Sequence, residues 1–164
     1  MKRPRIDADS LRNIIFGAED SLVSTTGLVV GVSVGSQDLR VALMAGFVAL
    51  IVEALSMGVG AYLSEQAVHE LEPEKHQDNL VIEGLLMFGS YVIAGFVPLT
   101  PLLILDYPSS IWGTIATALA GLFLLGYAKG NYLGIPALRS GVQMFVLGGL
   151  AALAGIAVGL IFKV

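Results

Sequence analysis

The sequence contains no cysteine, and only 13% of its 164 residues are charged. The absence of cysteine excludes disulfide bonds and metal sites built on thiolates. The scarcity of charge, together with a mean hydropathy of +0.82, excludes an ordinary soluble domain, whose surface needs more charged side chains. The chain is therefore expected to be an integral membrane protein surrounded by a lipid bilayer.

Other function classes lack their characteristic residues too. The sequence has no nucleophile–base pair, no phosphate-binding glycine loop and no H-x-x-x-H motif, so neither an enzyme nor a prosthetic group is expected. It has no basic patch with interleaved aromatic residues, so nucleic acid is not an expected partner. The basic start MKRPRIDADSLR precedes a segment long enough to span a membrane, without an A-x-A cleavage site. We interpret it as a cytosolic tail rather than as a signal peptide.

Five stretches have the composition of membrane-spanning helices, which need about 20 apolar residues each. Pro98 and Pro101 are expected to kink or end the third helix. Nothing indicates a second domain, so residues 1–164 are predicted to form one all-α transmembrane domain, with residues 64–79 as a short acidic cytosolic loop. The predicted spans cover about 13–35, 40–63, 80–104, 109–128 and 137–162.

The distribution of Lys and Arg predicts the orientation of the chain. With the N-terminus inside, the outer segments hold only Arg40 and Lys163 of the nine basic residues. Cytosolic segments are enriched in Lys and Arg, so the N-terminus is predicted to be cytosolic and the C-terminus to lie on the opposite side. The inner basic residues are Lys2, Arg3, Arg5, Arg12, Lys75, Lys129 and Arg139.

Two acidic residues lie deep inside predicted spans, where an ionisable side chain is costly and indicates function. If the first two helices are antiparallel, Asp20 lies ~12 Å and Glu53 ~16 Å from the cytosolic boundary, at a rise of ~1.5 Å per residue. Met57 shares a helix face with Glu53, and Ser24 shares one with Asp20. Carboxylates bind divalent cations and exchange protons, and a thioether favours later transition metals. Each side chain also has a purely structural interpretation, as core packing or as a hydrogen bond between helices.

The segment after the second predicted helix is acidic and holds both histidines, His69 and His76. Glu65, His69 and Glu72 fall within about 60° of one another if the helix continues. Carboxylate and imidazole are suitable ligands for Fe²⁺, Mn²⁺ or Zn²⁺, so these three residues are metal-binding candidates. They are expected at the cytosolic mouth, outside the hydrocarbon. The same composition also fits a solvated acidic loop.

Glycines at four-residue spacing let membrane helices approach closely. Gly27, Gly31 and Gly35 form such a series in the first predicted helix, and Gly155 and Gly159 form a shorter one in the fifth. Two interpretations stay open, namely contact within one subunit and contact between two subunits.

Three stretches of the sequence resemble the vacuolar iron transporter family. RNIIFGAEDSLVSTTGLVVGV and EALSMGVGAYLSEQ are similar to its first and second helices, and ALRSGVQMFVLGGLAALAGIAVG is similar to its fifth. The resemblance implies a five-helix homodimer that exchanges Fe²⁺, and often Mn²⁺, for protons along a path at the dimer interface. It implies that Asp20 and Met57 line this path. A glutamate of the second helix also belongs to the path, and Glu53 is the candidate for it.

The sequence departs from this family at three points. Ser21 stands where the family usually has glycine, Ala61 stands where an acid is common, and a short loop replaces a large cytosolic domain. The resemblance predicts a metal/proton antiporter that removes Fe²⁺ or Mn²⁺ from the cytosol, in the plasma membrane of a prokaryote or the vacuolar membrane of a eukaryote. The short loop favours an alternative, a non-transporting membrane scaffold or a metal-responsive partner protein. An exporter of organic cations is a further alternative.

Overall fold

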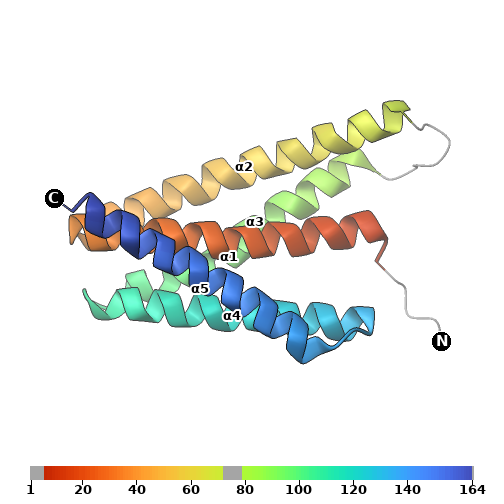
Figure 1. Ribbon diagram of the computed structural model, residues 1–164. Coiled ribbons are helices and arrows are strands. Elements are labelled where there is room, and N and C mark those ends of the chain that lie inside the picture. The colour runs from red at the N-terminus through yellow and green to blue at the C-terminus, as the bar shows by residue number, and fades with distance from the viewer. Residues whose placement is uncertain (1–5, 72–78, 164) are drawn as a thin grey trace.

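The computed structural model describes residues 6–71 and 79–163, which form five long α-helices (Figure 1). All five are long and apolar enough to cross a membrane, because even the 25-residue helices extend about 38 Å, more than the ~30 Å hydrocarbon layer. The prediction of an all-α, multi-pass membrane protein is confirmed. The helices are α1 (Ala8–Ser36), α2 (Leu39–Leu71), α3 (Leu80–Ile104), α4 (Ser109–Leu133) and α5 (Ala137–Ile161).

The first helix begins earlier than predicted because a capping residue extends it. Asp7 accepts a hydrogen bond from the backbone N–H of Ser10 at 2.8 Å, which satisfies one of the donors left unpaired at a helix start. The same hydrogen bond lowers the pKa of the Asp7 carboxyl. The cap places Ser10 and Asn13 inside the helix, on a face that contacts α3.

The second helix is longer than predicted. It continues to Leu71, whereas the sequence predicted an end near residue 63. Residues 64–71 are therefore helical, and residues 72–78 of the connection lie outside the described part of the chain. The extension carries Glu65 and His69 on a helix, where the helical period fixes the direction of their side chains.

The third helix passes through Pro98 and Pro101 and continues to Ile104, so neither proline ends it. A proline inside a helix removes the N–H that would pair with the carbonyl four residues earlier. For Pro101 this carbonyl belongs to Val97. The hydroxyl of Thr117 on α4 lies 3.4 Å from it, but the single proton of this hydroxyl has a closer acceptor, the carbonyl oxygen of Gly113, at 2.9 Å.

The first helix is the centre of the bundle. Among the described residues, α1 packs against α2, α3, α4 and α5, whereas α2 packs only against α1 and α3. Figure 1 shows α2 along one side of α1 and α5 crossing α1 towards α4. Within the described residues α2 and α5 make no contact. The face of α1 between them, which carries Phe16, Asp20, Ser24, Leu28 and Val32, is therefore not covered by another helix of the described chain, and we call it the uncovered face.

Glycines bring α1 and α5 into close contact. A Cβ added at Gly31 would lie 2.9 Å from the carbonyl oxygen of Gly155, and one added at Gly35 would lie 3.3 Å from that of Gly159. Small residues allow such close backbone contact between helices in a membrane. Of the two interpretations of the glycine series, the structure supports contact within one subunit.

Candidate functional site

Glu53 lies in α2, and hydroxyl groups from two other helices hold its carboxylate. Ser24 of α1 donates to Oε2 at 3.0 Å, and Tyr91 of α3 donates to the same oxygen. The two hydroxyl oxygens lie 2.6 Å apart. Three helices thus meet at one ionisable group inside a predicted span, where such a group indicates function by default.

Among the described residues, only one oxygen of the Glu53 carboxylate accepts hydrogen bonds. Oε2 accepts both hydroxyls, whereas Oε1 has no hydrogen-bond partner among the described residues. No Lys or Arg in the described part of the chain forms an ion pair with Glu53. An ionised carboxylate has about four acceptor positions, so Oε1 keeps its lone pairs for a cation or a proton.

Asp20 lies one turn before Ser24 on the same side of α1 and is half-buried. Within residues 6–71 and 79–163 its carboxylate has no hydrogen-bond partner. It lies within electrostatic range of Glu53. Because two negative charges repel strongly in a low-dielectric environment, this pair favours occupants that neutralise it, either a cation or protons.

Met57 lies one turn after Glu53 on α2 and packs against the apolar cluster that contains Tyr91. The structure therefore brings two of the predicted residues, Asp20 and Glu53, into electrostatic range and places Met57 on the same stripe of α2 as Glu53. Among the described residues, no three His, Asp or Glu side chains are grouped so that they could hold a metal ion. Within one chain the site therefore offers two carboxylates and one thioether.

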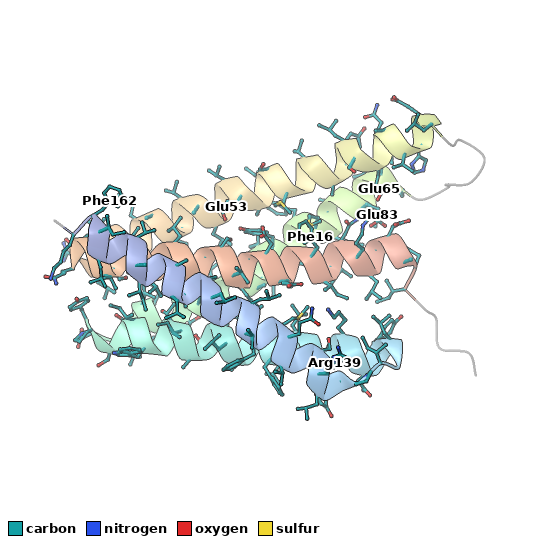
Figure 2. The ribbon with its side chains drawn as sticks, viewed as in Figure 1. Phe16, Glu53, Glu65, Glu83, Arg139 and Phe162 are labelled. Carbon is teal, nitrogen blue, oxygen red and sulfur yellow. The ribbon has the colours of Figure 1, made fainter. Side chains whose placement is uncertain are left out.

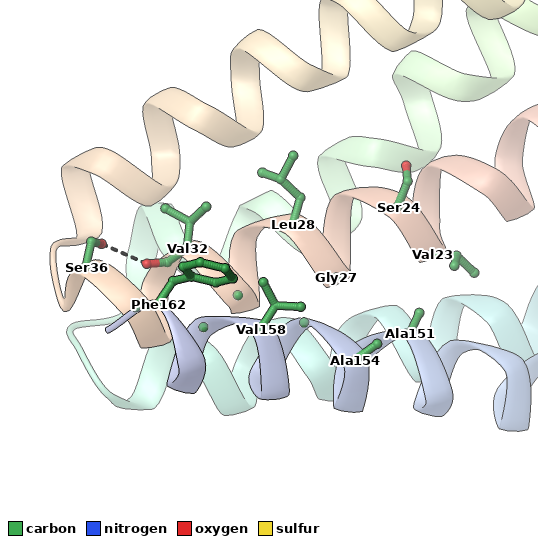
Figure 3. A pocket seen from close by; sticks show the side chains of 14 residues that line it. Val23, Ser24, Gly27, Leu28, Val32, Ser36, Ala151, Ala154, Val158 and Phe162 are labelled. Carbon is green, nitrogen blue, oxygen red and sulfur yellow. Dashed lines mark hydrogen bonds between the residues drawn. The ribbon is translucent and has the colours of Figure 1, made fainter. Parts of the chain in front are cut away.

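An apolar groove of about 670 Å³ follows the uncovered face, between α1 and α5. Ser24 belongs to its lining, together with Leu28, Val32, Val158 and Phe162. Figure 3 shows Phe162 close to Val32 near one end of the groove and Ser24 towards the other. The side chain of Ser24 therefore connects two features, because it lines the groove and donates to Glu53.

The uncovered face continues beyond Ser24 towards the start of α1. Phe16 lies one turn before Asp20, and 51% of its surface is exposed (Figure 2). The face thus carries an exposed aromatic residue, a half-buried carboxylate and a hydroxyl before it reaches the apolar groove.

At the end of the bundle where α1 begins, Glu65 of α2 forms an ion pair with Arg12 of α1. Only 3% of Glu65 is exposed, so its side chain is turned into the bundle rather than towards solvent. His69 follows one turn later, with its Nδ1 2.9 Å from the carbonyl oxygen of Glu65. Metal binding by Glu65, His69 and Glu72 stays a prediction, and Glu72 lies outside the described residues.

A second buried carboxylate at this end was not singled out from the sequence. Glu83 of α3 is 2% exposed and accepts hydrogen bonds from Ser10 Oγ at 2.5 Å and from Asn13 Nδ2 at 2.7 Å. Asn79 caps α3, so Glu83 lies in the first turn, where the helix dipole favours negative charge. Ser10 and Asn13 share a face at a spacing of three residues, but this spacing alone does not reveal their partner on α3.

Comparison with known proteins identifies the family. The sequence model of the VIT family matches residues 11–80 and 66–160. The chain belongs to the VIT family. Vacuolar iron transporter 1 of Arabidopsis thaliana is 24% identical over 206 aligned residues, which cover 88% of this chain and 82% of that protein. Vacuolar iron transporter homolog 2 of Oryza sativa subsp. japonica is 28% identical over 164 residues, covering 89% and 87%. VIT-like transporter 1b of Glycine max is 29% identical over 167 residues, covering 89% and 72%.

Membership of the VIT family confirms the resemblance seen in the sequence and places the chain among transporters rather than enzymes. Asp20, Glu53 and Met57 lie within the matched stretch 11–80. Tyr91 lies within the second stretch, 66–160, and sequence reasoning missed it. An aromatic residue in an apolar helix gives no signal that separates a buried hydroxyl donor from ordinary core packing.

Proposed function

We propose that this VIT family protein transports a divalent transition-metal ion, Fe²⁺ or Mn²⁺, across the membrane in exchange for protons. The observation that supports the proposal is the pair of half-buried carboxylates, Asp20 on α1 and Glu53 on α2, which lie on two helices that pack against each other. No Lys or Arg of the described residues pairs with either of them. The relative from Arabidopsis thaliana is named an iron transporter, in keeping with a metal ion as the cargo.

The exchange follows from the charge of this pair. When Asp20 and Glu53 are both ionised, one divalent cation or two protons neutralise them, and occupancy by both at once is unfavourable. Release of the metal ion on one side is therefore accompanied by protonation, so that one M²⁺ crosses against two H⁺. Met57 supplies a softer ligand than oxygen, which favours transition-metal ions over Mg²⁺ and Ca²⁺.

The proposal includes a homodimer in which the uncovered face of each α1 is turned to a second copy. Asp20 and Ser24 lie on this face, and lipid cannot satisfy a carboxylate there. A two-fold axis brings the same patch of both copies together, so a second Asp20 reaches the interface. The pair of copies then offers more ligands than the two carboxylates and one thioether of a single chain.

The direction of transport follows from the orientation. We place the N-terminus in the cytosol, because seven of the nine Lys and Arg residues then lie in inner segments. In this orientation the metal ion leaves the cytosol while protons enter it. The membrane is the plasma membrane in a prokaryotic source and the vacuolar membrane in a eukaryotic one.

Liposomes that contain the purified protein and a pH-sensitive dye test this function. Addition of Mn²⁺ or Fe²⁺ outside is expected to raise the lumenal pH while metal accumulates inside, because protons leave as the metal ion enters. Protein-free liposomes serve as the control. Metal uptake without any change of lumenal pH contradicts the exchange, and the absence of metal uptake at saturating concentration contradicts transport itself.

One observation favours a second candidate function. The alignment with the Arabidopsis thaliana relative extends over 206 positions, although this chain has 164 residues, so the relative contains residues that this chain lacks. A family member without them could be a non-transporting scaffold or a metal-responsive partner of another protein. The liposome experiment separates the two candidates, since a scaffold moves neither metal nor protons.

A further inference from the structure

We infer that Tyr91, together with Ser24, is a positioning residue that holds the Glu53 carboxylate in place for the metal ion. The inference rests on one part of the proposed function, namely that Glu53 binds the cation. It adds a group on α3, a helix that supplies none of the predicted ligands.

The surroundings of Tyr91 fix its hydroxyl in space. The residue is fully buried and belongs to the apolar cluster that also contains Leu50 and Ala54 of α2 and Leu99 of α3. A ring packed on several sides has little freedom to rotate. Its hydroxyl, which reaches Glu53 and Ser24, is therefore a donor at a fixed position.

Both hydroxyls donate to the same oxygen of Glu53. Ser24 and Tyr91 engage Oε2, which leaves Oε1 without a hydrogen-bond partner among the described residues. Two donors on one oxygen prevent the carboxylate from turning freely about its terminal torsion, which is otherwise broad. The position of Oε1 is thereby defined before a metal ion arrives.

A simpler interpretation is that Glu53 serves only to satisfy a buried tyrosine. A buried hydroxyl without a partner costs about 1–3 kcal/mol, so such a pair could act in stability alone. The two interpretations differ in their consequences for metal binding. Loss of a group that orients a ligating carboxylate typically weakens metal affinity about 10- to 100-fold, whereas loss of a purely structural hydrogen bond leaves the affinity unchanged.

Equilibrium binding of Mn²⁺ to the full chain in detergent tests the inference, with Tyr91→Phe as the variant. Phenylalanine keeps the ring and removes only the hydroxyl. We expect the dissociation constant for Mn²⁺ to rise about 10- to 100-fold. Tyr127→Phe is the matched control, because it is the same chemical change on the exposed side of α4, and its affinity should equal that of the native protein. An unchanged affinity in Tyr91→Phe, with a lower unfolding temperature, overturns the inference.

Ser24→Ala provides a second test if Tyr91→Phe does not fold. The small serine lies at the edge of the groove, where loss of one oxygen is easily tolerated, and Ser56→Ala at an exposed position of α2 is its control. We expect weaker Mn²⁺ binding for Ser24→Ala and native binding for Ser56→Ala; equal binding in both overturns the inference. A native protein that binds Mn²⁺ without moving it across liposomes contradicts the proposed function alone, whereas a native protein that binds no Mn²⁺ overturns both.

Discussion

Four acidic side chains of the bundle differ in the hydrogen-bond and ion-pair partners of their carboxylates. Glu65 pairs with the guanidinium of Arg12, Glu83 accepts hydrogen bonds from two neutral donors, and Glu53 accepts two hydroxyls on one oxygen. Asp20 has no hydrogen-bond partner among the described residues. A carboxylate whose acceptor positions are filled is held in place, whereas one with open positions can exchange its occupant. Near the start of α1, Glu65 and Glu83 are held by partners of the bundle, whereas Asp20 and Glu53 keep open acceptor positions among the described residues, as the proposed transport requires.

At the residue scale, Asp20→Asn is expected to abolish metal uptake into liposomes and to leave the protein folded. Asparagine keeps the shape of the side chain but carries neither negative charge nor a transferable proton. Asp38→Asn is the matched control. Asp38 accepts the backbone N–H of Arg40 at 2.8 Å in an exposed turn, and an amide oxygen can accept the same bond. Uptake at the native rate in Asp20→Asn would exclude Asp20 from the site.

Substitution of Met57 by leucine is expected to change metal selectivity more than stability. The two side chains are similar in volume, and such exchanges usually cost less than ~1.5 kcal/mol in a core. Leucine lacks the sulfur lone pairs that favour transition metals. Competition of Mg²⁺ or Ca²⁺ with Mn²⁺ uptake should therefore increase. Met44→Leu, at a position of α2 that is 65% exposed, should behave like the native protein. Equal selectivity in both variants would leave Met57 with a packing role only.

At the scale of the helices, the ion pair between α1 and α2 makes a prediction about stability. Arg12→Gln leaves the buried Glu65 without its cation and is expected to destabilise the protein by about 1–3 kcal/mol. The Arg12 side chain is 59% exposed, so water offsets part of the loss. Thermal unfolding in detergent measures the effect.

The double variant Arg12→Gln with Glu65→Gln is the control for this prediction. It has no unpaired charge at this contact, and its two amides can hydrogen-bond to each other. We expect it to be more stable than Arg12→Gln alone. A double variant whose loss equals the sum of the two single losses would show that the two side chains are not coupled.

The contact between α1 and α5 makes a second prediction at this scale. A Cβ at Gly155 would collide with the carbonyl oxygen of Gly27, whereas one at Gly149 would meet nothing within 4 Å. Gly155→Ala is therefore expected to cost about 1–3 kcal/mol, because the backbones must move apart. Gly149→Ala in the same helix should be neutral or stabilising by up to about 1 kcal/mol, since alanine favours the helix. Equal unfolding temperatures for the two variants would contradict the close packing of α1 and α5.

At the scale of the whole molecule, the uncovered face of α1 leads to a test of the proposed dimer. The native chain has no cysteine, so a single introduced cysteine reports on one position only. Phe16→Cys, on the uncovered face, should cross-link two copies in the membrane. Ile93→Cys on α3, where the native residue is 75% exposed, should remain uncross-linked. Cross-linking of neither variant, or only of Ile93→Cys, would count against a dimer formed through α1.

The sequence supports prediction of the elements better than prediction of the contacts between them. Long apolar stretches indicate the five spans. Counting from the ends of antiparallel helices predicts that Asp20 and Glu53 lie at a similar depth, and this stays a prediction. The hydrogen bonds of Tyr91 and Glu83 and the ion pair of Glu65 depend on which faces of α1, α2 and α3 are in contact. Hydrophobic periodicity does not encode this, because in a membrane both the lipid-facing and the protein-facing sides are apolar.

The central position of α1 has a consequence for the order in which the protein is made. The helix is synthesised first, yet its contact between Gly31 and Gly155 closes a loop of about 120 residues, a separation whose entropic cost grows only slowly with length. Until α3 emerges, Ser10 and Asn13 lack the carboxylate that later accepts from them. Until α5 emerges, the glycine face of α1 meets lipid. The polar and glycine faces of the first helix therefore have no protein contacts until the later helices are inserted, and insertion of the last helix completes the packing around α1.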